Sequence, residues 1–551
     1  MTWTMRTDPS GLQTRWSDEQ AQAWRDAGDW RNETLADVAR AAVAADPDHI
    51  LLIEGERRST RAEAWDQALR LAGFFQSKGL EPGDVVSFQL PNWTETAVIA
   101  LAARICGLIV NPIPPIYRES ELAYILADCG AKLIFVPGTF RKYDHHGAVE
   151  ALRPSLPALR DVVVVRDAGD LTWEQALAGD PVDPDSLPVV DPAAVLIVMY
   201  TSGTTGRPKG VLHTHYSYGH RARTMGEAWG IGPADVVFMP SPVTHITGAL
   251  WAFDMPWLFG NASVLIDVWA AEDGIDCIAR NGCTVTGGAT PFLQQMLDVA
   301  QDRPEALASL RLFFCGGTTV SPDLIRRASS AFPDCLFFRC YGSTEMLTAT
   351  LGIRDRAQAR LGAETDGEIV APVEMRIVDA VTDAPLPDGE EGEILACGPG
   401  LFVGYLHPSD NEGAFLDDGF FRMGDLGRIA EERYIVITGR KKDIIIRSGE
   451  NISPKEVEDL LAEHPAVAEV AIVAMPSAVT GEKGCAFIIP RAGQTIDLAE
   501  IRRFLDRAGL ARQKFPEHVV LVDDLPRVPS GKVKKDVLRL RAKEIAAAEL
   551  S

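Results

Sequence analysis

Hydrophobic and polar positions alternate along the first part of the chain in blocks that predict β-strands separated by α-helices. Short apolar runs at residues 84–90, 132–136 and 162–165 predict buried strands. The apolar stretch 96–107 predicts a helix between the first two strands, and Thr34 precedes an amphipathic helical pattern as its N-cap. This βα alternation predicts an α/β fold with parallel sheets wrapped by helices.

The pattern changes in the last third of the chain. Residues 368–396 combine period-two runs with turn signals, which predicts a small antiparallel or barrel-like subdomain. A strand pattern then ends at Gly439, and the charged residues 440–443 mark a second boundary.

Beyond that boundary the pattern predicts a small α+β unit of about a hundred residues. Ser453 and Glu456 are spaced as a capping box, with Pro454 in the first turn of the helix. A final set of patterns predicts two strands and one helix, at residues 470–475, 485–489 and 497–508.

The length and net charge of the chain limit the classes of protein to which it can belong. With 551 residues the chain is too long for one compact core, so two or more folding units are expected. Its 54 lysines and arginines against 77 aspartates and glutamates give a net charge of −23. Such a surface repels nucleic acid and anionic membranes, so neither is an expected partner.

The cysteines and the apolar segments favour the cytoplasm. Nine cysteines are scattered without a C-x-x-C pair, which is typical of reduced thiols in a cytosolic protein. The first residues lack the apolar region of a signal peptide. The apolar segment 96–110 is interrupted by Arg104 and is too short to span a bilayer. We therefore expect no integral membrane association.

Residues 200–210, Y-T-S-G-T-T-G-R-P-K-G, follow the apolar run 193–199 and have the composition of a phosphate-binding loop. Glycines let backbone N–H groups surround phosphate oxygens, the hydroxyl side chains are donors, and Lys209 adds a positive charge. The spacing differs from that of a Walker A loop. A glycine- and serine-rich loop alone is more often a turn or linker, but its position after a buried strand favours a nucleotide site.

A second cluster is Y-G-S-T-E, residues 341–345. Tyr341 suits stacking on an adenine ring, and Gly342 lets a ligand approach the backbone. Thr344 can donate to a phosphate, and Glu345 can hold Mg²⁺, which prefers carboxylate and phosphate oxygens. The alternative for this cluster alone is a turn followed by a helix cap.

Three further clusters complete the set. Asp425 lies in a glycine-flanked turn, where it can accept from two ribose hydroxyls or form an Asx-turn. Residues 439–452 are a charged block that fits either a ligand site or a solvated hairpin. Lys532 lies in P-S-G-K, a loop near the C-terminus, where a lone lysine is ordinarily exposed.

In this order the clusters resemble the adenylate-forming superfamily of acyl-CoA synthetases, aryl-acid and amino-acid adenylating enzymes and luciferases, and are most similar to acyl-CoA ligases. The five motifs match in residue type, order and approximate spacing, from about Thr34 to Leu540. The resemblance implies an N-terminal domain, 1–439, of two doubly wound βα subdomains plus a small β-barrel-like subdomain. It further implies a hinge at 440–443 and a mobile α+β C-terminal domain, 444–551.

The resemblance implies ATP-dependent activation of a carboxylic acid to acyl-AMP, then thioester formation with release of AMP. ATP, Mg²⁺ and coenzyme A are the implied cofactors. Lys532 is then expected to bridge the substrate carboxylate and the α-phosphate, Thr344 to contact that phosphate and Glu345 to place Mg²⁺. Tyr341 is expected to stack on adenine and Asp425 to bind the ribose hydroxyls.

The resemblance assigns further positions to cofactor binding. The β- and γ-phosphates are expected to contact Thr201, Ser202, Gly203, Thr204, Thr205 and Lys209. The rest of the nucleotide side comprises Gly316, Gly317, Gly342 and Arg440. Arg447, Ser448 and Gly449 are expected to form the tunnel for the thiol after the small domain swings about Lys442.

The acyl pocket is expected to begin at residues 240–250, where the resemblance gives His245 a catalytic role at the acyl site. No aspartate lies at residues 239–250, where amino-acid-activating relatives carry one. Ile246 stands where relatives that activate salicylate carry asparagine, so a substrate hydroxyl there would lack a partner. We predict an apolar pocket for a medium-chain, alicyclic or unsubstituted aromatic acid. Residues 287–291 and 315–318 are expected to wall it, with glycines that leave room for bulk.

Three other functions remain open, one of them a luciferase-like oxygenase, which shares the motifs. A stand-alone aryl-acid adenylating enzyme would load a separate carrier protein, because the chain contains no carrier domain. A non-catalytic nucleotide-binding protein would not need Lys532, Glu345 and Asp425 together. A homodimer also remains open.

Overall fold

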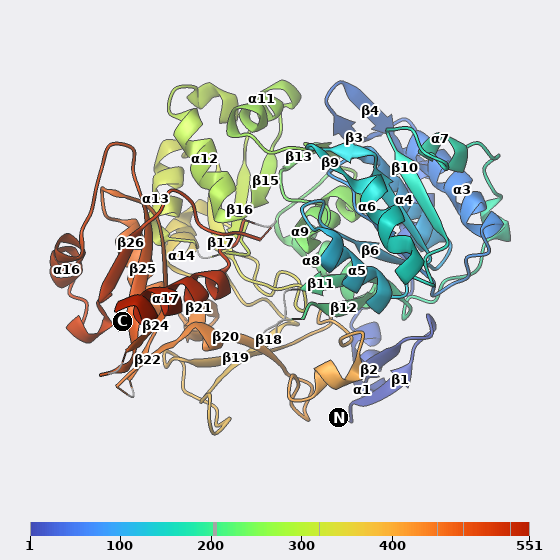
Figure 1. The fold of residues 1–551 in the computed structure, drawn as a ribbon. Helices are drawn as coiled ribbons and strands as arrows, with labels where there is room; N and C mark the ends of the chain where they lie inside the picture. The colour runs from blue at the N-terminus through green and yellow to red at the C-terminus, as the bar shows by residue number, and fades with distance from the viewer. Residues whose placement is uncertain are drawn as a thin grey trace.

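The computed structural model describes residues 2–201, 207–318, 320–448, 450–477, 479–528 and 531–549. Within these residues the strands form two large βα sheets, an antiparallel sheet and a smaller sheet near the C-terminus (Figure 1). The two βα sheets lie beside each other, the antiparallel sheet lies below them in this view, and the C-terminal unit lies to the left. The predicted α/β fold is confirmed.

The first βα sheet carries the phosphate-loop sequence at one edge. Its strands run in the order β10 (Asp161–Val165), β7 (Leu133–Pro137), β5 (Val85–Phe88), β6 (Ile109–Pro112), β11 (Val195–Thr201) and β12 (Lys209–Thr214). All neighbours are parallel except β11 and β12, which pair Thr201 with Lys209. The phosphate-loop sequence therefore joins two antiparallel strands at the edge of the sheet.

Helices cover this sheet on both faces, as the pattern predicted. They are α2 (Leu35–Ala45), α3 (Arg61–Ser77), α4 (Thr94–Ile105), α5 (Glu119–Asp128), α6 (His145–Leu152), α7 (Trp173–Ala176) and α8 (His215–Ala228). The hairpin β8 (Thr139–Phe140) and β9 (Tyr143–Asp144) precedes α6. Thr34 caps α2 through a capping box with Asp37, which confirms the predicted N-cap.

The second βα sheet has the strand order β17 (Leu336–Cys340), β16 (Leu312–Gly316), β15 (Val285–Gly288), β13 (Val236–Met239), β14 (Ala262–Leu265), β3 (Ile50–Glu54) and β4 (Arg57–Thr60). All pairs except β3–β4 are parallel. Its helices are α9 (Ile246–Ala249), α10 (Met255–Phe259), α11 (Ala271–Asn281), α12 (Thr290–Ala300), α13 (Pro322–Ala331) and α14 (Ala359–Glu364).

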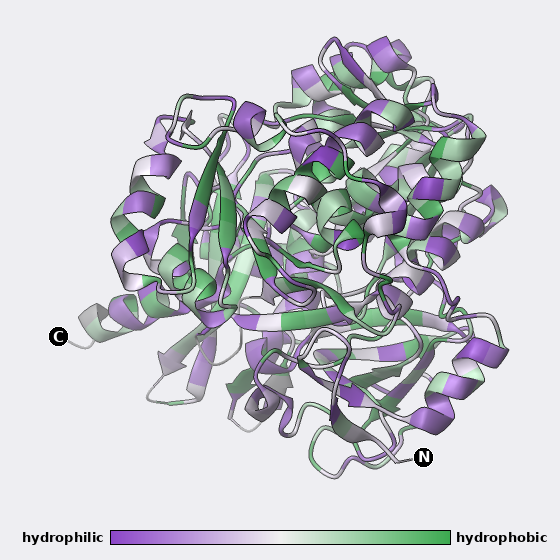
Figure 2. Cartoon of the chain, turned by 90° about the vertical axis from the view of Figure 1, so that its right-hand side faces the viewer, coloured by the Kyte–Doolittle hydropathy of each residue, from purple (hydrophilic) through white to green (hydrophobic). Residues whose placement is uncertain are grey.

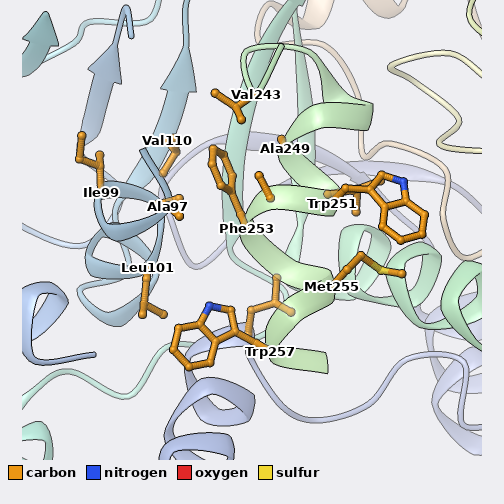
Figure 3. Close-up of a cluster of buried hydrophobic side chains, with 14 of the residues drawn as sticks. Ala97, Ile99, Leu101, Val110, Val243, Ala249, Trp251, Phe253, Met255 and Trp257 are labelled. Carbon is orange, nitrogen blue, oxygen red and sulfur yellow. The ribbon is translucent and has the colours of Figure 1, made fainter. Parts of the chain in front are cut away.

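One hydrophobic core joins the two βα sheets. All twelve residues of α4 are buried, because small and apolar side chains surround this helix on every side. A π-helix, Leu250–Asp254, connects α9 to α10 and packs against α4. Figure 3 shows Phe253 pointing from this helix toward Ala97 and Val110, with Trp251 on the opposite side.

A buried ion pair fixes α4 to the π-helix. The Arg104 guanidinium makes a bidentate contact with the Asp254 carboxylate, and the two side chains are 2% and 0% exposed. Burial raises the pKa of Asp254 to about 6, although the Arg104 charge opposes this shift. Arg104 is the residue that interrupts the apolar segment of the sequence, and this pairing explains its presence there.

The predicted antiparallel subdomain is a four-stranded sheet, and a short N-terminal unit packs beside it. The sheet has the order β18 (Glu374–Val378), β19 (Gly392–Cys397), β20 (Phe421–Ala430) and β21 (Tyr434–Arg440). The N-terminal unit, residues 2–30, contains the hairpin β1 (Thr4–Thr7) and β2 (Gln13–Trp16), followed by α1 (Asp18–Asp26). Both lie in the lower part of Figure 1.

The C-terminal unit is an α+β structure, as predicted. Its strands are β22 (Ile445–Arg447), β23 (Glu450–Ile452), β24 (Val467–Ser477), β25 (Gly481–Pro490) and β26 (His518–Leu521). Its helices are α15 (Pro454–Ala462), α16 (Leu498–Arg507) and α17 (Lys535–Glu549). Across the chain as a whole, Figure 2 shows hydrophobic residues gathered in the inner strands and hydrophilic residues frequent on the outer helices.

The predicted capping box at the start of α15 is wrong. Ser453 occupies the N-cap position, but its side chain makes no cap hydrogen bond. Its hydroxyl donates instead to the Thr438 carbonyl on β21, and Glu456 pairs with Lys514. The long-range contact replaces the local one and attaches α15 to the antiparallel sheet.

Among the helices of the described residues, none combines the length and apolar composition that a membrane span requires.

Replacing Arg104 with methionine is expected to destabilise the protein by about 3–5 kcal/mol, because it leaves the Asp254 carboxylate buried without a partner. Urea denaturation measures the free energy of unfolding. The double variant Arg104→Met/Asp254→Leu is expected to lose less, since both charges are removed. A single variant within about 1 kcal/mol of wild type would contradict the role of the pair.

Candidate active site

The loop that carries Lys532 is fixed to the C-terminal unit by its neighbours. Val528 N–H donates to the Lys532 carbonyl at 2.8 Å, and Lys534 N–H donates to the Pro526 carbonyl at 2.7 Å. The Arg527 guanidinium donates to the Gly531 carbonyl at 3.0 Å and pairs with Glu469 on β24. These contacts attach Lys532 and its described neighbours to the C-terminal unit.

Lys532 lies near charged residues from β20, from the end of β21 and from the turn that follows it. Its charged neighbours there are Arg440, Asp425, Lys442 and Asp443. Asp425 lies within β20, so the predicted turn at this residue is wrong. Burial, followed by the Arg440 charge, lowers the pKa of Lys532 from 10.5 to about 7, while Asp425 opposes this shift. The structure thus brings together Lys532, Asp425 and Arg440, which are far apart in the sequence.

Asp425 is positioned by two groups that the sequence assigned to the same nucleotide. The Tyr341 hydroxyl donates to Asp425 Oδ2 at 2.6 Å, and Arg440 Nε lies 3.1 Å from Asp425 Oδ1. Asp425 is only 6% exposed. Each carboxylate oxygen retains an unused lone pair, so the carboxylate can still accept from two hydroxyls of a ligand.

The acyl-side residues approach Lys532 from the second βα sheet. His245 is the N-cap of α9, and its Nδ1 accepts from Thr247 N–H. Burial, and then the Lys532 charge, lowers the pKa of His245 to about 4, so the imidazole is neutral at ordinary pH. Gly531 has φ +85°, and a Cβ there would lie 3.5 Å from Pro291 and 3.8 Å from Ala289.

Two contacts fix the walls predicted for the acyl pocket. Thr290 and Thr318 hydroxyls lie 2.8 Å apart, so residues 287–291 and 315–318 are joined directly. Asn92 accepts from Val243 N–H at 2.8 Å and donates to the Ser241 carbonyl at 3.0 Å, which anchors the segment before His245. No motif in the sequence indicates this role of Asn92.

The expectation that the wall glycines leave room for bulk is wrong for three of the four. A Cβ on Gly316 would lie 2.5 Å from the Cys340 carbonyl oxygen. A Cβ on Gly287 would lie 2.4 Å from the Phe314 ring, and one on Gly288 would lie 2.8 Å from Ser241 Oγ. These glycines accommodate the protein's own atoms. Gly317, at φ +78°, has no atom within 4 Å of a Cβ position and does face open space.

Aromatic rings pack beneath this wall. Trp229 stacks on Phe314 with ring centroids 5.0 Å apart and on Trp251 at 6.0 Å. Phe314 and Trp251 stack at 5.4 Å. Ile246 is buried next to His245 and belongs to the same core, so the surroundings of this segment are apolar.

The phosphate end contains a lysine that already has a counter-ion. Lys209 Nζ lies 3.2 Å from Asp410 Oδ1 and 4.9 Å from the centre of the Tyr405 ring. The predicted phosphate-binding residues Ser202, Gly203, Thr204 and Thr205 lie outside the described residues. Thr201, which pairs with Lys209 across the strands, is described.

Two residues that the sequence did not indicate position the Y-G-S-T-E turn. His213 Nε2–H donates to the Thr344 carbonyl at 2.7 Å, and burial lowers the pKa of His213 to about 4, so this ring is neutral. The Tyr405 hydroxyl donates to Glu345 Oε1 at 3.0 Å. In the sequence, Tyr405 is marked only by the preceding glycine in G-Y.

Arg447 and Ser448, predicted for the thiol side, contact other residues of the C-terminal unit. Arg447 Nε lies 2.7 Å from Glu517 Oε1, within the C-terminal unit. Ser448 has φ +52°, and its N–H donates to the Thr480 carbonyl at 2.8 Å. Gly449 lies outside the described residues.

The fold and site match one family of enzymes. Residues 39–406 match the family model "AMP-binding enzyme", and residues 456–532 match "AMP-binding enzyme C-terminal domain". The chain therefore belongs to the adenylate-forming enzymes. It is an acid–thiol ligase of the AMP-forming class, and its chemistry is the activation of an acid by adenylation.

Individual relatives cover nearly the whole chain. The medium-chain fatty-acid–CoA ligase of Escherichia coli (strain K12) is 36% identical over 529 residues, which are 95% of this chain and 93% of that enzyme. The salicyl-AMP ligase / salicyl-S-ArCP synthetase of Mycobacterium tuberculosis (strain ATCC 25618 / H37Rv) is 32% identical, over 94% of this chain and 92% of that enzyme.

A solved structure with bound ATP is similar to nearly the whole chain. ATP-bound MatB from Rhodopseudomonas palustris has a TM-score of 0.84 at 29% identity, over 94% of this chain and 100% of that chain. The apo form of MatB gives a TM-score of 0.73. The arrangement of this chain is thus more similar to the ATP-bound form.

The side chains fit the ATP and Mg²⁺ that this family uses. The described residues contain no cluster of three or more His, Cys, Asp or Glu side chains placed to enclose a metal ion. Mg²⁺ bound together with a nucleotide needs only one or two carboxylates, because phosphates and waters complete its shell. Glu345 is half-buried and can supply such a carboxylate, and Asp425 retains acceptor capacity for a ribose.

Binding of MgATP is expected to raise the pKa of Lys532, because phosphate charge favours the ammonium form. In the free closed protein Lys532 is mostly neutral above its pKa of about 7, so binding takes up a proton there. The uptake is expected to be near zero below about pH 6 and to approach one proton near about pH 8.5.

Calorimetry of MgATP binding in two buffers of different ionisation enthalpy measures this uptake. The Lys532→Met variant, which has no titrating amine at this position, is the control and is expected to lose it. An uptake that is the same in both proteins would show that Lys532 does not meet the nucleotide.

Proposed function

We propose that the protein converts an apolar carboxylic acid to its acyl-CoA thioester through an acyl-AMP intermediate. The observation that carries the proposal is the position of the Lys532 loop. Its charge lies beside Asp425 and Arg440 on the nucleotide side, while Gly531 lies against Ala289 and Pro291 on the acyl side. One cation is therefore placed where an acid and a nucleotide would meet.

The side chains can then be given roles in the first step. ATP with Mg²⁺ supplies the adenylyl group and the pyrophosphate leaving group. Lys532 stabilises negative charge on the α-phosphate and the incoming carboxylate, where fixed donors have the largest effect on rate. Asp425 accepts from the ribose, Tyr341 supports that carboxylate and borders the adenine, and Thr344 donates to the α-phosphate.

Thioester formation needs a different arrangement of the C-terminal unit. We assign residues 1–439 to the N-terminal domain, 440–443 to the hinge and 444–551 to the mobile domain. Rotation about Lys442 removes the Lys532 loop and brings Arg447, Ser448 and Gly449 toward the site. The Arg447–Glu517 ion pair, 2.7 Å long, lies within the mobile domain and can persist during rotation.

The substrate is an apolar acid of medium-chain, alicyclic or unsubstituted aromatic type. Ile246 offers no hydrogen-bond partner beside His245, and the Trp229–Trp251–Phe314 stack lies in the same core. A buried hydroxyl on the substrate would remain unpaired there, at a cost of about 1–3 kcal/mol. Similarity to a medium-chain fatty-acid–CoA ligase supports this choice.

An alternative acceptor is the phosphopantetheine arm of a separate carrier protein. The similarity to an enzyme described as a salicyl-S-ArCP synthetase favours this second candidate. Both candidates share the adenylation step and differ only in the thiol. All nine cysteines are free thiols, which supports a reducing compartment such as the cytoplasm for either candidate.

Lys532→Ala is expected to slow acyl-AMP formation about a hundredfold, equivalent to about 3 kcal/mol of transition-state stabilisation. Thioester formation from supplied acyl-AMP is expected to stay close to wild type. Single-turnover assays of the two half-reactions measure this difference. Lys142→Ala, at an exposed lysine, is the matched control. Equal losses in both half-reactions would contradict the alternation of domains.

A screen of carboxylic acids for AMP release, with ATP–Mg²⁺ and either coenzyme A or a holo-carrier protein, tests the proposed function. We expect apolar acids to support turnover with free coenzyme A. Activity only with a carrier protein would establish the alternative acceptor. Activity confined to hydroxybenzoates would contradict the inference from Ile246.

A further inference from the structure

Residues 399–406, which we call the bridging segment, connect the phosphate end of the site to other parts of the fold. On one side the segment pairs with β12: Val403 N–H donates to the Leu212 carbonyl at 3.0 Å and Leu406 N–H to the Gly210 carbonyl at 2.8 Å. On the other side Phe402 N–H donates to the Glu345 carbonyl at 2.8 Å. The bridging segment thus lies between the strand that begins with Lys209 and the turn that ends with Glu345.

The side chain of Tyr405, in the bridging segment, contacts both Glu345 and Lys209. Its hydroxyl donates to Glu345 Oε1 at 3.0 Å, and Lys209 Nζ lies 4.9 Å from its ring centre. Burial, followed by the Glu345 charge, raises the pKa of Tyr405, so the hydroxyl remains a donor. The Tyr405 hydroxyl occupies one oxygen of the Glu345 carboxylate, and no side chain of the described residues donates to the other.

The N-terminal unit, residues 2–30, holds the bridging segment from outside. Arg15 N–H donates to the Val403 carbonyl at 2.6 Å, and the indole Nε1–H of Trp30 donates to the buried Pro399 carbonyl at 2.9 Å. These residues precede residue 39, at which the family-model match begins.

Aromatic and cationic side chains make this attachment rigid. The Arg15 guanidinium lies 3.5 Å from the centre of the Phe415 ring and 4.7 Å from the Trp3 ring. Phe415 in turn stacks on Phe402 of the bridging segment, with centroids 5.2 Å apart. Burial lowers the pKa of Arg15 to about 10, so this side chain is still cationic at neutral pH.

We propose that the N-terminal unit and Tyr405 form a brace that positions Glu345 for the metal ion of the nucleotide. Tyr405 and Trp30 are positioning residues: Tyr405 orients the carboxylate directly, and Trp30 fixes the backbone from which Tyr405 projects. The inference rests on the proposed function, since it takes Glu345 as the carboxylate for Mg²⁺. It extends the site to a part of the chain outside the family-model match.

The proposal predicts that loss of the brace weakens the binding of Mg²⁺ but leaves the affinity for ATP without metal unchanged. Partners that orient a metal-binding side chain typically change metal affinity about 10–100-fold when they are removed. The affinity gained when Mg²⁺ is added to ATP isolates this effect, because ATP without metal uses the other contacts of the site. A residue that is only structural would change both affinities equally.

Tyr405→Phe removes the hydroxyl and keeps the ring. Calorimetry of ATP binding to the full-length protein, with Mg²⁺ and with EDTA, is expected to show the Mg²⁺-dependent gain reduced about tenfold. ATP binding in EDTA is expected to be unchanged. The matched control is Tyr143→Phe, since the Tyr143 hydroxyl also donates to a glutamate, Glu119, at 2.8 Å on an exposed surface.

The role of the Glu345 carboxylate can be tested in a double-mutant cycle with Tyr405. Glu345→Gln is expected to remove the Mg²⁺-dependent gain, and adding Tyr405→Phe to Glu345→Gln is expected to cause no further loss. Additive losses would show that Tyr405 acts independently of Glu345 and would overturn the proposal.

Trp30→Phe tests the N-terminal part of the brace, because it removes only the donor to Pro399 and most of the ring remains. The Mg²⁺-dependent gain is expected to fall about threefold. Trp269→Phe is the control, since the Trp269 indole also donates a hydrogen bond, to Gln295 at 2.6 Å. Melting temperatures of all variants identify any general loss of stability.

These outcomes distinguish a failure of the brace from a failure of the proposed function. Variants that keep the full Mg²⁺-dependent gain, in a wild-type background that binds MgATP, overturn the brace and leave the proposed function intact. A wild-type protein that binds no ATP under any condition overturns both.

Discussion

The site depends on one electrostatic constraint: Lys532 has to enter a space that already contains other positive charge. Arg440 and Lys442 lie near its amine, and burial with these charges lowers the pKa of Lys532 to about 7. Asp425 compensates only in part, because the Arg440 guanidinium already pairs with its carboxylate. The negative charge of a nucleotide would remove the conflict, so this position of Lys532 and nucleotide binding favour each other.

The rest of the fold brings four chain segments together around Lys532. The β11–β12 hairpin supplies Lys209, the Y-G-S-T-E turn supplies Glu345, β20 supplies Asp425, and the Gly531 turn approaches the acyl wall. The π-helix and α4 hold the two βα sheets together through the buried Arg104–Asp254 pair. The hydroxyl of Ser453 attaches α15 to β21 near the same place.

Local sequence signals predicted the elements, and long-range contacts decided what the sequence did not reveal. The Thr34 cap could be predicted because its partner Asp37 lies three residues away. The Ser453 capping box failed because the Thr438 carbonyl, distant in sequence, is the acceptor. The predicted open space at Gly287 failed for the same reason, since Phe314 from the adjacent strand fills it.

In the candidate site, too, local sequence signals predict only part of the structure. Motif residues such as Asp425 and Lys532 are recognisable because a fixed sequence surrounds them. Tyr405 and His213 lie 60 and 131 residues from the groups that they contact, Glu345 and the Thr344 carbonyl, and no local pattern indicates either contact. Their geometry depends on tertiary packing, and it appears only in the folded chain.

Trace labelling of lysine amines with acetic anhydride, from about pH 6 to about pH 11 and quantified at Lys532 by mass spectrometry, tests the central claim most directly. The account predicts that the Lys532 amine titrates near pH 7, well below the ordinary value of 10.5, and that MgATP protects it from labelling. Titration near 10.5 with no protection by MgATP would contradict the insertion of this charge beside Asp425 and Arg440.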